Sequence, residues 1–183
     1  VRLVRLTTET LQGIPSIVYG FFGLVVLVPA LQAMFGSGKS IVTASIMLGI
    51  MILPTIISVS ESSLRAVPES YYEGSLALGA THERSVFSAV FPAARSGILA
   101  GIILGVGRAI GEAMAVMMVS GNAPNMPKLF ESVRFLTTAV ASEMSYAGGL
   151  QRQALFSIAL VLFLFIMLIN VFLSVCVKRR KEG

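Results

Sequence analysis

The sequence predicts an all-α membrane protein, a polytopic bundle of transmembrane helices. Hydrophobic residues make up 55% and charged residues 13% of the 183 residues, and the mean hydropathy is +0.85. This composition is too apolar for an ordinary soluble domain. Runs long enough to cross a bilayer as helices, about 20 residues each, occur four times. We therefore expect a single transmembrane domain over residues 1–183 with four spans.

The predicted spans are the charge-poor runs of the chain. They cover residues 14–35, 40–60, about 96 to about 121, and 154–176. Pro29 and Pro54 lie inside the first two, where proline kinks a helix but is tolerated if neighbouring groups satisfy the freed carbonyls. The segment 121–152 is too polar to span, and we expect a short helix near residues 131–146.

The lysines and arginines predict the orientation of the chain. If both termini and the loop 61–95 share one side of the membrane, nine of these residues lie there and four lie on the other side. An excess of positive charge marks the cytoplasm, which makes segment 121–152 external. Because the basic tail "KRRKEG" directly follows the last span, it indicates a topological anchor and not a nucleic-acid partner.

A nucleotide-hydrolysing site is not expected in this chain. The segment "GSGKS", residues 36–40, resembles the end of a phosphate-binding loop, but Ala33 stands where the first glycine belongs and a helix precedes it in place of a strand. The chain also contains no aspartate, the usual magnesium ligand in such sites. We predict that the chain is not an enzyme and holds no metal or other cofactor. His82 is expected to be solvated or capping.

Two short helices joined by a glycine are predicted in the loop 61–95. Pro68 suits the start of the first helix, which Gly79 then ends. Thr81 suits the N-cap of a second helix that runs up to Pro92. An amphipathic hairpin lying on the membrane without a protein partner would show the same pattern, so periodicity leaves both alternatives open.

An arginine and a glutamate interrupt the third span. On one helix Gly97, Gly101, Gly105, Arg108 and Glu112 fall within roughly 80° of arc. The glycines permit close helix packing, so this face should point into the bundle, where the two charges can reach each other. The pair either locks helices together or serves a charged substrate.

The loop from Glu73 to Pro92 resembles the EAA loop of ABC importer permeases. The family pattern is E-A-A, three residues, G, nine residues, I, one residue, L-P, and the spacing matches throughout. The departures are Gly74 and Ser75 for the alanines, Ala89 for isoleucine and Phe91 for leucine. The resemblance implies that this loop docks into a cytoplasmic ATPase through Glu73, Gly79, Ala80 and Pro92.

A longer resemblance covers nearly the whole chain. The segments "GIPSIVYGFFGLVVLVP", "LRAVPESYYEGSLALGAT", "GRAIGEAMAVMMVSGN" and "ALFSIALVLFLFIMLIN" are similar to C-type permeases of bacterial phosphate-specific transport systems. The resemblance implies a type I ABC importer permease in the inner membrane, of which this chain, beginning without methionine, holds the last four of about six spans. It also implies an ATPase dimer, an A-type permease and a periplasmic or lipid-anchored phosphate-binding protein as partners.

The resemblance implies that the substrate served by Arg108 and Glu112 is phosphate. The guanidinium of Arg108 offers a planar set of donors for phosphate oxygens, and Glu112 would compete for the arginine and so promote release. Another oxyanion, molybdate or sulfate, would suit Arg108 equally. An ion-coupled secondary transporter would show inverted repeats, and no second copy of "GRAIGEAM" is present. A channel subunit would need no ATPase-docking loop.

Overall fold

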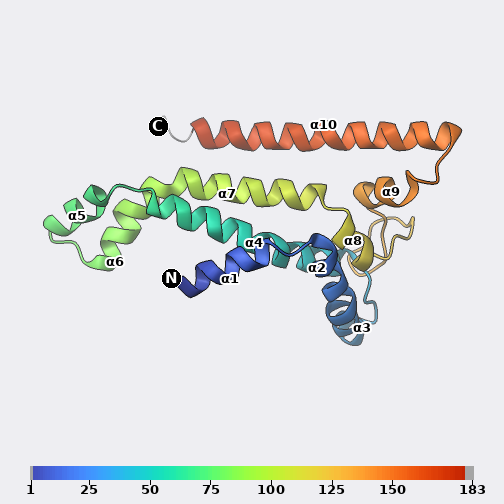
Figure 1. The fold of residues 1–183 in the computed structure, drawn as a ribbon, viewed down its shortest axis with the longest axis horizontal. Coiled ribbons are helices and arrows are strands. Elements are labelled where there is room, and N and C mark those ends of the chain that lie inside the picture. Colours follow the sequence, from blue (N-terminus) through green and yellow to red (C-terminus); the bar gives the residue numbers. More distant parts are fainter. Residues whose placement is uncertain (1, 180–183) are drawn as a thin grey trace. The chain divides into compact units, whose positions relative to one another are not determined.

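The computed structural model of the chain describes residues 2–179, and this part is helical (Figure 1). Within it, strand-like pairing is limited to one isolated parallel bridge between Gly121 and Val133. The elements in chain order are α1 Arg2–Gln12, α2 Ser16–Phe22, η1 Gly23–Leu27, α3 Val28–Phe35, α4 Ile41–Arg65, α5 Glu69–Ala77, α6 His82–Ser85, η2 Val86–Val90, α7 Phe91–Gly111, α8 Met114–Val119, α9 Leu136–Glu143 and α10 Gly149–Arg179. The all-α class is confirmed.

The four predicted spans are confirmed as helices. Among the described residues, four helices are long and apolar enough to cross a membrane: Ser16–Phe35, Ile41–Arg65, His82–Gly111 and Gly149–Val175. The extent predicted for the third span was wrong at both ends. Its helix begins at His82 because the second loop helix runs into it without a break, and it ends at Gly111, well before residue 121.

Two of the spans contain a π-helical turn directly before a proline. The Val28 N–H donates to the Gly23 carbonyl just before Pro29, and the Phe91 N–H donates to the Val86 carbonyl just before Pro92. In a regular helix the proline ring would collide with the carbonyl four residues earlier, and the wider turn relieves that collision. The prediction that the second loop helix stops at Pro92 was therefore wrong.

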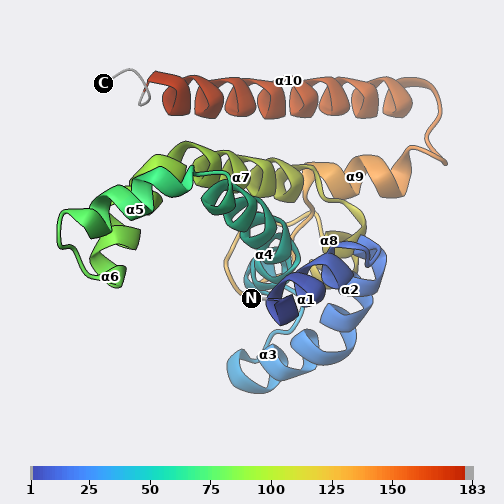
Figure 2. The same ribbon diagram turned by 60° about the vertical axis from the view of Figure 1, so that its left-hand side comes forward.

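The chain forms two compact units. Among the described residues, the first comprises residues 2–12, Leu53–Val106 and residues 170–179. Within it α7 lies alongside the second half of α4 (Figures 1 and 2). Gln12 at the end of α1 donates a side-chain hydrogen bond of 2.9 Å to the carbonyl of Pro54 in α4, which ties these two helices together.

The second unit comprises Gly13–Ile52 and Gly107–Ile169. Its core is formed by side chains from α2, α3, α4 and α8, namely Tyr19, Val28, Ala44, Met47, Met51, Ala115, Val116 and Val119. The close approach of α2 and α8 depends on Gly20, because a Cβ there would lie 2.7 Å from the Ala115 Cα. Small residues at such contacts let helix backbones meet in a membrane.

The loop between α8 and α9 folds back onto the end of α8 within the second unit. The Val133 N–H donates to the Ser120 carbonyl at 3.1 Å, and the Ser40 N–H donates to the Val119 carbonyl at 3.2 Å. Asn122 takes a positive φ of 56°, a conformation that asparagine tolerates better than most residues. The short helix expected near residues 131–146 is confirmed as α9, with tighter bounds.

Candidate functional site

The loop between α4 and α7 forms a helix hairpin that turns at Gly79. Gly79 has a φ of +84°, and its N–H donates to the Leu76 carbonyl at 2.8 Å while the Ala80 N–H donates to the Ser75 carbonyl at 3.2 Å. These two bonds form a Schellman motif, which ends a helix at a left-handed glycine and satisfies its last carbonyls. The predicted helix stop at Gly79 is confirmed.

The second arm of the hairpin begins as predicted at Thr81. The Thr81 hydroxyl accepts a hydrogen bond from the Arg84 N–H at 3.4 Å, which satisfies one of the free donors of the first turn. Across the turn, the Tyr72 hydroxyl and His82 Nδ1 lie 2.7 Å apart and share a hydrogen bond. Their rings also meet edge to face, with centroids 5.7 Å apart. The hairpin is thus closed by side chains as well as by backbone.

The outer surface of the hairpin is exposed and partly apolar. Leu78 is 91% exposed and Phe87 is 70% exposed, and α5 contains no buried residue. The side chains of Glu73 and Pro92 are also exposed, whereas Ala80 is half-buried. Large apolar side chains on a projecting, hydrogen-bonded hairpin are suited to contact with a protein partner.

The glycine face of α7 lies against α4 in the first unit. Gly101 and Gly105 are buried, and a Cβ at Gly101 would lie 3.0 Å from the Val59 Cβ. A Cβ at Gly97 would meet the side chain of Ser63 even more closely. α4 thus fills the space beside Gly97 and Gly101, and these two glycines let the helices lie close together.

Arg108 and Glu112 stand on either side of the end of α7. The helix stops at Gly111, so the two charges do not share the one continuous helix on which their pairing was argued. Glu112 accepts a hydrogen bond of 3.1 Å from the Ala115 N–H in the first turn of α8, which satisfies one of the donors left free there. The side chain of Arg108 is exposed.

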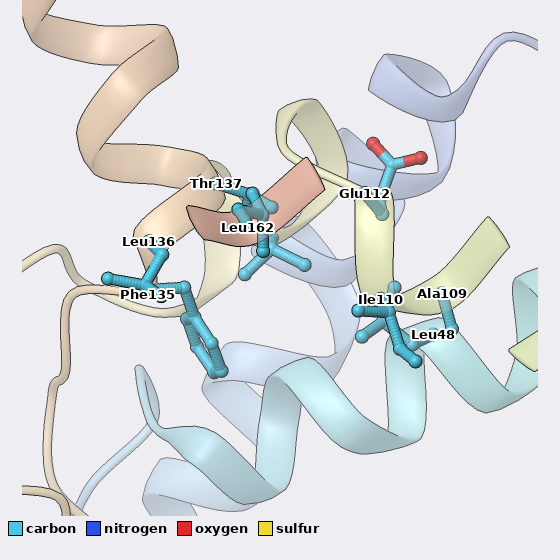
Figure 3. Close-up of a pocket in the computed structure, with 9 residues that line it drawn as sticks. Leu48, Ala109, Ile110, Glu112, Phe135, Leu136, Thr137 and Leu162 are labelled. Atoms are coloured by element: carbon cyan, nitrogen blue, oxygen red, sulfur yellow. The ribbon is translucent and has the colours of Figure 1, made fainter. Parts of the chain in front are cut away.

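A cavity of about 330 Å³ lies beside Glu112 within the second unit (Figure 3). Figure 3 shows the Glu112 carboxylate pointing away from Ile110 and Leu48. The wall consists of Leu48, Ala109, Ile110, Glu112, Val116, Phe135, Leu136, Thr137 and Leu162. An apolar wall with one carboxylate offers phosphate only the Thr137 hydroxyl as a side-chain donor, so this cavity alone does not make an anion site.

One polar cluster was missed by sequence reasoning. Arg134 pairs with Glu143 and donates from Nε to the Asn122 carbonyl at 3.2 Å, while Gln151 donates from Nε2 to Glu143 at 3.3 Å. These contacts tie α9 to the loop before it and to the start of α10. The residues lie in irregular segments or near the ends of helices, so no periodic pattern could have paired them.

The fold and these features define a helical membrane protein that carries an exposed helix hairpin between two of its spans. The model of the family described as "Binding-protein-dependent transport system inner membrane component" matches residues 2–182. The chain belongs to this family. Its members are transport components of the inner membrane, in agreement with the predicted membrane location.

Individual relatives point to the same group. The chain is 42% identical to the probable ABC transporter permease protein YqgH of Bacillus subtilis over 92% of its length. It is 33% and 35% identical to the phosphate transport system permease protein PstC of Haemophilus influenzae and of Pasteurella multocida, over 88% and 100% of its length. The predicted resemblance to phosphate transport permeases is confirmed. No solved structure matches the chain.

The matched relatives are longer than this chain. It spans 58% of YqgH, 58% of the Haemophilus influenzae protein and 64% of the Pasteurella multocida protein. The comparison therefore covers less than two thirds of the length of each of these relatives.

Proposed function

We propose that the chain forms part of the permease of an ATP-driven importer of inorganic phosphate and docks the cytoplasmic ATPase. The observation that carries this proposal is the α5–α6 hairpin, an exposed projection in a member of a binding-protein-dependent transport family. Its turn is held by a Schellman motif and presents Leu78, and Phe87 is exposed on η2, which directly continues α6. A projection that is already held in one conformation loses less conformational entropy on binding a partner than a flexible loop does.

Phosphate is the proposed substrate because the PstC relatives are named as phosphate transport permeases. The chemistry of Arg108 agrees with this choice. Its guanidinium presents a planar fork of donors to phosphate oxygens. The side chain of Arg108 is exposed in the part of the chain that the structure describes.

Glu112 is proposed to regulate how long Arg108 holds the anion. When phosphate leaves, the carboxylate competes for the guanidinium, which prevents the arginine from retaining the anion. The hydrogen bond from the Ala115 N–H gives Glu112 a neutral partner while Arg108 is occupied by phosphate. The break between α7 and α8 places the carboxylate at the end of a helix, where small backbone changes can redirect it.

The proposed partners follow from this role. The hairpin binds a cytoplasmic ATP-binding subunit dimer, and the chain pairs with a homologous A-type permease. A periplasmic or lipid-anchored phosphate-binding protein delivers the substrate. Both termini of the chain lie in the cytoplasm, the chain itself hydrolyses no ATP, and it binds membrane lipid but no nucleic acid.

Uptake by the complete complex tests this function. Full-length permease, its partner subunits and the binding protein are reconstituted in proteoliposomes, and ATP-dependent uptake of labelled phosphate is measured. We expect uptake that excess phosphate suppresses and excess sulfate or molybdate leaves unchanged. Uptake of sulfate or molybdate in place of phosphate would overturn the assigned substrate, and uptake without ATP would overturn the importer class.

A further inference from the structure

The first arm of the hairpin is attached with little help from core packing. α5 contains no buried residue, so burial of apolar side chains does little to hold it in one orientation. A hydrogen bond of 2.7 Å joins Tyr72 on α5 to His82 on α6. The edge-to-face contact of their rings adds a second, directional attraction between the same two residues.

The two residues close a ring around the turn. They are ten positions apart, and Gly79 lies between them with its left-handed backbone. The Schellman motif sets the direction of the chain locally, whereas the Tyr72–His82 contact sets the angle between the arms. Both side chains have only two rotatable χ angles, so few conformations satisfy the contact.

The second arm leads straight into a membrane span. α6, η2 and α7 follow one another without an intervening loop and form the single helix His82–Gly111. His82 is the first residue of that helix. The contact between His82 and Tyr72 therefore connects α5, the first arm of the hairpin, to the first residue of the span that carries Arg108.

We propose that Tyr72 and His82 are positioning residues that couple the ATPase to the transmembrane helix. This inference rests on the proposed function. By fixing the angle between α5 and α6, they make movement imposed on α5 turn or shift α7. Their contact thus sets how much phosphate is moved per ATP hydrolysed, while the exposed surface of the hairpin determines whether the ATPase binds.

The contacts of His82 suit the positioning role better than they suit metal binding. Its Nδ1 already shares a hydrogen bond with Tyr72. Among the described residues, no group of three or more His, Cys, Asp or Glu side chains could hold a metal ion. A tyrosine partner on the neighbouring helix instead fixes the orientation of the imidazole ring.

The test uses the complete complex in proteoliposomes and two readouts. ATPase retention by the purified permease reports docking, and labelled phosphate accumulated per ATP hydrolysed reports coupling. Tyr72→Phe, which keeps the ring but loses the hydroxyl, should retain the ATPase and lower the coupling ratio about fivefold, the effect of losing one hydrogen bond. Tyr71→Phe removes a hydroxyl from the adjacent position and should leave the ratio unchanged.

Two histidine variants provide a matched pair. His82→Asn keeps a hydrogen-bonding group near the place of Nδ1 and should preserve much of the coupling, whereas His82→Gln moves that group to the place of Nε2 and should lower it. The positioning role would be overturned if Tyr72→Phe left the ratio of phosphate accumulated to ATP hydrolysed unchanged, or if the two histidine variants gave equal ratios. Loss of the ATPase from Tyr72→Phe would overturn it as well. Absence of phosphate uptake by the unmodified complex would instead overturn the proposed function.

Discussion

Individual glycines determine how closely the helices approach, and Gly20 is the sharpest case. An added methyl group would lie 2.7 Å from the Cα of Ala115 and 3.2 Å from the Sδ of Met118. The methionine can move aside, but the backbone of α8 cannot do so without disturbing the core around Ala115. Two glycines that look alike in the sequence can therefore differ widely in their tolerance of substitution.

We predict that Gly20→Ala destabilises the folded protein by about 1–3 kcal/mol, the usual cost of overpacking a well-packed contact. Gly49→Ala is the matched control, since nothing lies within 4 Å of a Cβ at Gly49. Replacing this helical glycine by alanine should leave stability unchanged or raise it by about 0.5–1 kcal/mol. Thermal unfolding of the purified complex in detergent checks both, and equal midpoints for the two variants would contradict the packing described here.

The sequence was sufficient to select Arg108 and Glu112 but not to place them. Their charge inside an apolar run marks them as unusual in any membrane helix. Whether the helix continues from Arg108 to Glu112 depends on tertiary contacts, because "GEAM" has no proline and only one glycine. The structure ends α7 at Gly111 and turns the Glu112 carboxylate to Ala115, which no helical projection could have shown.

At the scale of elements, the hairpin depends on the left-handed backbone at Gly79. No atom lies within 4 Å of a Cβ at this position, so within the chain a side chain there is opposed by backbone strain and not by crowding. Its φ of +84° costs a non-glycine residue free energy, with β-branched and bulky residues affected most.

Gly79→Leu should therefore weaken ATPase association, because it distorts the turn, while membrane insertion continues. Gly79→Asp should show the same effect to a lesser degree, since aspartate enters the left-handed region more readily. Gly74→Ala in the neighbouring α5 should leave association intact or strengthen it. Co-purification of the ATPase with each variant measures the effect, and normal recovery with Gly79→Leu would refute the assigned docking role of the hairpin.

The turn residues were the most predictable part of the hairpin. Glycine and threonine carry their structural preference in their own chemistry, so Gly79 and Thr81 could be assigned without knowledge of their neighbours. The prolines could not be assigned in the same way. Pro92 was expected to end a helix, yet the π turn η2 just before it makes room for its ring and the helix continues. A π turn depends on backbone adjustment over several residues, so the residue type alone does not predict it.

At the scale of the whole molecule, the lysine and arginine distribution predicts the topology. Cysteines introduced at Lys39 and Lys128 in a Cys176→Ala background should react with an impermeant thiol reagent added to intact cells, whereas one at Arg84 should not. All three side chains are exposed in the chain, so burial within the described part would not explain a difference in labelling. Labelling at Arg84 alone would reverse the proposed orientation.

The spans were predictable as a set because length and hydropathy decide whether a helix can cross a bilayer. Their packing was not. The contact between α2 and α8 joins Gly20 to Ala115, and positions so far apart in the sequence share no periodic signal. The same holds for Arg134 and Glu143, whose pairing depends on how the loop after α8 folds back.

Phosphate uptake by the charge variants at positions 108 and 112 tests the central claim most directly. Uptake and folded protein are measured for the unmodified complex, Arg108→Gln, Glu112→Gln and the double variant, since such a cycle isolates the interaction between the two charges. We predict that Arg108→Gln abolishes uptake with insertion and ATPase binding intact, that Glu112→Gln slows release of phosphate, and that the double variant folds but does not transport. Substantial uptake by the double variant would show that the charges serve packing alone and would contradict the account.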